Sequence, residues 1–224
     1  MAKLVRKFVI PGDIIAVGEY RAGSYIEKRD NQYIALRVGL AEIGRDEVKL
    51  NPLSGPYIPH VYDQVIGKII DITAFGWQVD INSPFFGYLP ASFVFGKEFS
   101  PSTHDLSSRF RIGDLIAAKV EAFDRTRDPQ LSIRGPGLGK IPKGEIIKMS
   151  PTKIPRLIGR KGDMIKMIAT KTGCELKVGQ NGVVVLTGPP EGILKAANAI
   201  KMIEHEAHVA DLAKKIQNYL VGGG

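Results

Sequence analysis

The sequence predicts a multidomain chain in which two all-β domains are followed by one smaller α+β domain. Three observations predict this order. The chain of 224 residues contains 25 glycines and 14 prolines, which fall in clusters between blocks of regular pattern. Short apolar runs typical of strands fill the first two thirds of the chain, and helical periodicity begins only after residue 142. We therefore expect domains at residues 1–60, 61–137 and 143–224, with residues 138–142 as a linker.

The first domain is predicted to consist of short strands and turns. Its strand-like segments are FVI, DIIAV, SYIEK, QYIALRV and EVKL, and the turns include PGD and RDN. No group of residues in this segment has the pattern of a catalytic or ligand-binding motif. We expect an all-β domain without a catalytic site of its own.

The second domain restarts the strand pattern after Asp63. Five segments, VIGKIIDI, WQVDI, FFGYLP, LIAAKVEAF and QLSIR, have the spacing of barrel strands with one long connection. This pattern predicts a small barrel of the OB-fold type. The stretch RGPGLGKIPKGE that follows is rich in glycine and proline, and it lacks the GK[ST] ending of a phosphate loop. It therefore predicts a linker.

The third domain is predicted to have the element order β-α-loop-α-β-β-α. The segment DMIKMIATKTG has apolar residues on one helical face and Gly173 at its end, and a hairpin is expected around GQNG. The last helical segment carries two apolar stripes, of which the second is rotated by about half a turn relative to the first. One straight helix cannot bury both stripes on one side, so we expect a break near residues 207–211, or a helix end that packs on another domain or subunit.

The loop GRKG, residues 159–162, is the first candidate site. It lies between two predicted helices, and its two glycines let the backbone approach a sugar-phosphate chain closely. The adjacent cations would then meet phosphates, and the N-terminus of the following helix also favours an anion. The candidate RNA-binding residues here are Gly159, Arg160, Lys161 and Gly162, with Lys153 and Arg156 on the preceding short helix.

The charge distribution supports a polyanionic partner. The net charge is +8, and residues 141–224 alone carry thirteen cations against seven anions. A solubilising charge is the alternative explanation. One cysteine, Cys174, excludes an internal disulfide, and no apolar run has the length of a membrane span. We expect a cytoplasmic protein with no membrane association, no cofactor and no metal.

Two segments resemble known RNA-binding families. IGRKGDMI, together with its flanking helices and hairpin, resembles the I-G-x-x-G-x-x-I core of a type I KH domain. The barrel, with Gly67-Lys68, Phe75-Gly76-Trp77 and Gly87-Tyr88-Leu89, resembles the ribosomal S-one-type RNA-binding barrel. That resemblance implies base stacking by aromatics and phosphate contacts by loop cations. The candidates are Lys68, Phe75, Trp77, Arg109, Arg111, Arg125 and Arg127, with Phe86 or Tyr88 as further stacking residues.

The order of the three domains resembles the RNA-binding cap subunit of the archaeal exosome, the ribosomal RNA-processing protein four family. The resemblance implies a non-catalytic subunit that binds single-stranded RNA and passes its 3′ end to phosphorolytic sites. Three copies, or a mixture with another cap subunit, would sit on a hexameric ring of RNase PH-type subunits. The first domain would dock onto that ring.

Other functions remain as alternatives. Transcription-elongation or translation-associated RNA-binding factors also combine such barrels with KH domains. A metal-dependent ribonuclease would need clustered carboxylates, but Asp71, Asp80, Asp124 and Asp128 form no compact motif. The pair His205 and His208 lacks the HExxH spacing and an evident third ligand. We therefore expect no catalytic residues.

Overall fold

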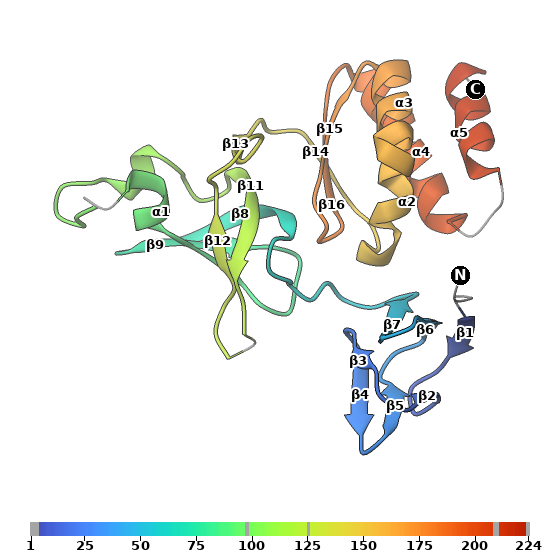
Figure 1. Cartoon of the computed structure of the whole chain (residues 1–224). Coiled ribbons are helices and arrows are strands. Elements are labelled where there is room, and N and C mark those ends of the chain that lie inside the picture. The colour runs from blue at the N-terminus through green and yellow to red at the C-terminus, as the bar shows by residue number, and fades with distance from the viewer. Residues whose placement is uncertain (1–4, 97–98, 125, 208–210, 223–224) are drawn as a thin grey trace. The chain divides into compact units, whose positions relative to one another are not determined.

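The computed structural model describes residues 5–96, 99–124, 126–207 and 211–222. The chain divides into two compact units, Met1–Gly55 and Pro56–Gly224. The second unit contains both the barrel and the α+β domain (Figure 1). Within the described residues, no helix combines the length and apolar character of a membrane span.

The N-terminal unit consists of two small, mostly antiparallel sheets around one apolar core. The four-stranded sheet has the order β1-β6-β7-β3, and the three-stranded sheet has the order β2-β5-β4. Val9, Ala41 and Leu50 are among the buried core residues. The strands are β1 Val5–Val9, β2 Ile14–Val17, β3 Arg21–Ala22, β4 Ile26–Arg29, β5 Gln32–Ala35, β6 Gly39–Ile43 and β7 Glu47–Pro52. The sequence did not predict β3, which has two residues and ends beside Gly23, or β6, which begins at Gly39 and ends beside Gly44.

The second unit opens with a closed barrel of the predicted type. Its strand order is β12-β10-β9-β8-β11-β13, and an additional pairing of β12 with β11 closes the sheet. Trp77, Ile69 and Leu131 are fully buried in its core. The elements are β8 Gln64–Thr73, β9 Gly76–Asp80, β10 Gly87–Pro90, α1 Ala91–Phe95, the 3-10 helix Leu106–Ser108, β11 Leu115–Ala122, β12 Gln130–Ser132 and β13 Gly139–Ile141.

The predicted linker at residues 138–142 is in part a strand. Gly139–Ile141 forms β13, which pairs with β11, and Ile141 is buried. The carboxylate of Asp114 accepts from the backbone N–H of Arg111 at 2.9 Å and from Lys140 Nζ at 2.6 Å. The Arg111 hydrogen bond, and then the Lys140 hydrogen bond, hold the pKa of Asp114 below its usual range. This segment is therefore fastened to the barrel and does not act as a free linker.

The α+β domain has the predicted element order. Its sheet has the order β14-β16-β15, and α2, α3, α4 and α5 contribute to one apolar core. The two helices α4 and α5 are separate, which confirms the predicted break. The elements are β14 Glu145–Lys148, the 3-10 helix Pro151–Lys153, α2 Ile154–Ile158, the 3-10 turn Arg160–Gly162, α3 Asp163–Thr172, β15 Glu175–Val178, β16 Val183–Thr187, α4 Pro190–His205 and α5 Leu212–Val221.

The turn between β15 and β16 joins the α+β domain to the barrel. The side chain of Asn181 is 0% exposed. Its amide nitrogen donates to the carbonyl of Ile66 at 2.7 Å and to that of Ile81 at 2.8 Å, and its oxygen accepts from the N–H of Ile66 at 3.2 Å. An apolar cluster containing Leu115, Val183 and Val185 lies at the same junction. The barrel and the α+β domain are therefore one packed body.

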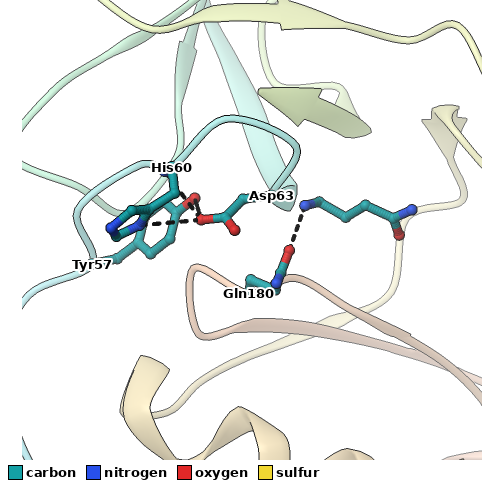
Figure 2. Close-up of polar contacts among 5 residues, drawn as sticks. Tyr57, His60, Asp63 and Gln180 are labelled. Carbon is teal, nitrogen blue, oxygen red and sulfur yellow. Dashed lines mark hydrogen bonds and ion pairs between the residues drawn. The ribbon is translucent and has the colours of Figure 1, made fainter. Parts of the chain in front are cut away.

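A second contact lies beside Asn181. Gln180 Oε1 accepts from the N–H of Gln64 at 2.6 Å, and Gln180 N–H donates to the carbonyl of Gln64 at 2.8 Å. Figure 2 shows Gln180 reaching toward the segment in which Asp63 accepts hydrogen bonds from the Tyr57 hydroxyl at 2.7 Å and the His60 N–H at 3.2 Å. The turn before β8 is thus fixed by Asp63 where the hairpin meets the barrel.

Candidate nucleic-acid interface

The loop at residues 159–162 presents its backbone and two cations to solvent. Gly159 and Gly162 have φ values of 75° and 83°, and Lys161 has φ 52°, so three of its four residues are left-handed. A Cβ at Gly159 would come within 2.8 Å of Met164 Cβ, and therefore the loop can fold against α3 only with glycine there. Arg160 and Lys161 are exposed, and their side chains have no hydrogen-bond or ion-pair partner within the described part of the chain.

Two predicted RNA-binding cations near the loop have structural partners. Lys153 Nζ donates to the carbonyl of Glu204 at 2.6 Å, and Arg156 Nε donates to the carbonyl of Ala207 at 2.7 Å. The carbonyl of Glu204 lies in the last turn of α4, where basic side chains are favoured by the helix dipole, and that of Ala207 follows just after the helix end. Lys153 Nζ therefore supports the fold with one hydrogen bond, and its ammonium group has two further N–H donors. Arg156 remains exposed, with its other guanidinium nitrogens outside this hydrogen bond.

The prediction that Trp77 stacks on an RNA base is wrong. Its side chain is buried in the barrel core, and its indole N–H donates to the carbonyl of Phe110 at 3.1 Å. Alternation along β9 directs Trp77 and Val79 inward, so the ring cannot stack on a base. Phe75, in the turn between β8 and β9, is 64% exposed and remains available. Phe86 is also exposed, whereas Tyr88 is half-buried.

The barrel cations lie on different segments. Lys68 is exposed on β8. Arg109 and Arg111 are exposed on both sides of Phe110, whose buried ring packs edge-on against Trp77 with the ring centroids 5.3 Å apart. The hydrogen bonds from Gly113 N–H to Ile69 O and from Ile69 N–H to Asp114 O fasten this loop beside Lys68.

Arg127 lies in the loop between β11 and β12, and it is exposed. In this loop Asp124 accepts from the Thr126 hydroxyl and N–H at 2.8 and 2.9 Å. The Thr126 hydroxyl, followed by its N–H, lowers the pKa of Asp124. The predicted Arg125 lies outside the described residues. Within the described residues, no group of three or more His, Cys, Asp and Glu side chains is arranged to hold a metal ion.

Sequence reasoning missed the role of the GQNG turn. An asparagine in a hairpin turn is commonplace, and nothing in the local pattern distinguishes one that hydrogen-bonds to another domain. It also missed a cavity beside the GRKG loop, because the cavity is formed in part by α5, which is distant in sequence.

The comparisons with known proteins agree with this architecture. Residues 144–202 match the KH domain family, and residues 59–134 match the S1 RNA binding domain family. The chain is 46% identical to "Exosome complex component Rrp4" of Nitrosopumilus maritimus, over 96% of each chain. It is 41% identical to the protein of the same description in Sulfurisphaera tokodaii, over 96% of this chain and 88% of the relative.

A solved structure is also similar. The crystal structure of a candidate exosome complex RNA-binding protein matches with a TM-score of 0.69 and 41% identity, over 75% of this chain and 97% of that one. Both matched domain families are binding modules, and the likeness extends over nearly the whole chain. The chain therefore belongs to the Rrp4 family of exosome complex components.

Proposed function

We propose that this chain is a non-catalytic subunit of an exosome, which caps a ring of RNase PH-type subunits and feeds single-stranded RNA 3′ ends into it. The observation that carries this proposal is the 46% identity, over 96% of both chains, to a protein described as an exosome complex component. The chain supplies binding surfaces, and the ring supplies phosphorolysis. Degradation or processing of RNA is then the outcome of the assembly.

The RNA contact is electrostatic in this proposal. Arg160 and Lys161 bind phosphates while the bare backbone at Gly159 and Gly162 allows close approach. On the barrel, Phe75 stacks on a base, and the exposed cations Lys68, Arg109, Arg111 and Arg127 bind phosphates. Such contacts tolerate any sequence, which suits a subunit that delivers many RNAs.

Ring docking is assigned to the N-terminal unit. Phe8 on β1 is 57% exposed and lies opposite Leu40 on β6, which is also exposed. Further apolar side chains of this unit are exposed to solvent, namely Val5, Ile10, Ile14, Val17, Leu36, Val38 and Leu53. So many exposed apolar residues in a unit of this size support a protein-protein interface.

We propose three copies of the chain on each hexameric ring, either alone or together with another cap subunit, in the cytoplasm. The single cysteine, Cys174, is buried and free, as suits a reducing compartment.

The test is a native pull-down of the full chain from its own cells, followed by mass spectrometry. RNase PH-type subunits in a threefold assembly are the expected result. Recovery of RNA polymerase or ribosomal proteins in their place would retain RNA binding and remove the degradation role.

A further inference from the structure

A cavity of about 670 Å³ opens directly beside the GRKG loop. Gly159 and Arg160 of the loop form part of its wall, and α3 contributes Asp163 and Met167. Leu212 of α5 and Asp211, which directly precedes this helix, form the opposite part. A volume of this size is within the range of sites that hold small organic ligands. The loop and the cavity therefore form one continuous surface.

The cavity depends on α5, which lies outside the matched KH region at residues 144–202. The buried side chains Leu212, Ile216 and Leu220 pack α5 into the same core as α3 and α4. Because α4 ends at His205 and α5 starts again at Leu212, the first turn of α5 is placed beside the loop. The helix break gives this domain a wall that the matched region alone lacks.

The cavity combines an apolar interior with polar groups that lack partners. Met164 and Leu212 are buried in its wall, and Met167 is half-buried. Thioethers of methionine make favourable contacts with aromatic rings. The exposed side chains of Arg160 and Asp163 form no ion pair or hydrogen bond with any residue that the structure describes. Among the residues that the structure describes, the Asp211 side chain has only a 4.0 Å pair with Lys214, and both side chains are largely exposed.

The chemistry of this wall fits a nucleobase better than a phosphate. Arg156 and Arg160 line the same cavity as the carboxylates Asp163 and Asp211, so its wall is close to neutral and does not select a phosphate. The carboxylates accept hydrogen bonds only from N–H or O–H donors. A base stacked on the methionines would bring its amino and imino edge to these carboxylates. Guanine offers two adjacent donors, N1–H and the 2-amino group, to a single carboxylate, whereas uracil has no amino group.

We propose that the cavity between α3 and α5 binds one base of the RNA whose phosphates contact the GRKG loop, and that it prefers guanine. This inference rests on the proposed function, because it requires RNA at the loop. Continuity with Gly159 and Arg160 places a base within reach of the cavity when the sugar-phosphate chain lies on the loop. The barrel contacts do not discriminate between RNA bases.

The test measures binding of the full chain to three single-stranded RNAs by fluorescence anisotropy. The first is oligouridine, the second has a guanine at every fourth position, and the third has inosine at those positions and so lacks only the 2-amino group. We expect the guanine RNA to bind about five- to tenfold tighter than the inosine RNA, the factor expected for one net hydrogen bond at a solvent-exposed carboxylate.

The double variant Asp163→Asn with Asp211→Asn should reduce the guanine-to-inosine ratio to about one. Its affinity for oligouridine should stay equal or rise, because two negative charges are lost. Asparagine tolerates the left-handed conformation of Asp211, whose φ is 60°. The matched control is Glu191→Gln, which removes an exposed carboxylate from the first turn of α4 and should leave the ratio unchanged.

A second variant tests the space itself. Ala213 is exposed and lines the cavity, so the indole of Ala213→Trp should fill the cavity. This variant should also reduce the guanine-to-inosine affinity ratio to about one. Equal binding of guanine and inosine RNAs by the wild type, with normal affinity for oligouridine, would overturn the cavity proposal alone. A preference that persists in both variants would also overturn it. If the wild type binds none of the three RNAs, the proposed function fails together with it.

Discussion

The KH domain contains two loops with the same Gly-x-x-Gly spacing, and the structure gives them opposite roles. GRKG at residues 159–162 exposes two cations without partners among the described residues. GQNG at residues 179–182 buries Asn181 against the barrel. A Cβ at Gly179 would approach the backbone nitrogen of Ile66 to 2.7 Å, so here glycine permits close contact with another domain. The residues between the glycines decide whether such a loop binds its own protein or remains free for a ligand.

The largest expected effect comes from the buried loop. Asn181→Ala would leave the N–H and carbonyl of Ile66 and the carbonyl of Ile81 without these partners. We expect a loss of about 3 to 4 kcal/mol in the free energy of unfolding, because each buried unpaired group costs about 1–3 kcal/mol. Calorimetry of the full chain should show a Tm lower by about 10 °C.

The control for this prediction is Gln180→Ala in the same turn. Gln180 is less buried in its contact with Gln64, and water can replace its side chain, so the loss should be about 1 kcal/mol or less. Equal losses in the two variants would show that Asn181 is not the joint between the domains.

The free loop should affect RNA binding and leave stability unchanged. Arg160→Glu with Lys161→Glu should weaken single-stranded RNA binding by about ten- to a hundredfold, because two phosphate contacts become repulsions. The Tm should change little, since neither side chain has a partner in the described structure. Anisotropy titration at fixed salt measures the affinity.

The matched control reverses two exposed charges on α4, Lys195→Glu and Lys201→Glu. It changes the net charge equally, and a comparable loss of affinity in this control would show a general charge effect and no specific role of the loop.

The two glycines of the free loop should differ in their tolerance of alanine. At Gly159 both the φ of 75° and the 2.8 Å approach to Met164 Cβ oppose a side chain, so Gly159→Ala should cost about 2–3 kcal/mol. At Gly162 the nearest atom is Ile165 Cγ2 at 3.8 Å, and only the backbone conformation opposes the change, which costs about 1 kcal/mol. Urea unfolding would compare them, and a larger loss at Gly162 would contradict this reasoning.

The smallest effect concerns the segment that fastens β13 to the barrel. Asp114→Asn should cost about 1 kcal/mol at neutral pH, because the ion pair with Lys140 is lost. The folded pKa of Asp114 is lowered, so this contribution is complete above the ordinary value of about 4 and disappears as pH falls through the folded value. The Tm difference between wild type and variant should therefore shrink in acid. A difference that is constant down to about pH 2 would exclude the carboxylate as its cause.

The free loop could be predicted from the sequence, whereas the bound one could not. GRKG is marked by its glycines, its cations and the helical periods on either side, all of which are local. Asn181 carries no such signal, because its partners Ile66 and Ile81 are about one hundred residues away. Local sequence signals therefore identify the candidate ligand site, whereas they do not reveal the long-range contacts that hold the domains together.

The wrong predictions have the same origin. Trp77 was a stacking candidate because strand alternation does not reveal which face is inward until the partner strands are known. The hydrogen bond of Lys153 Nζ was missed for the same reason, because its acceptor, the carbonyl of Glu204, lies at the end of a distant helix. The strand β13 was predicted as linker because the glycine- and proline-rich stretch around it gave no sign of its pairing with β11.

The most direct test of the contrast between the two loops is ultraviolet crosslinking of single-stranded RNA to the full chain, with the crosslinked residues identified by mass spectrometry. Crosslinks at residues 159–166 and none at residues 179–182 are the predicted result. Crosslinks at residues 179–182, or crosslinks confined to the barrel, would contradict the assignment of the GRKG loop to RNA.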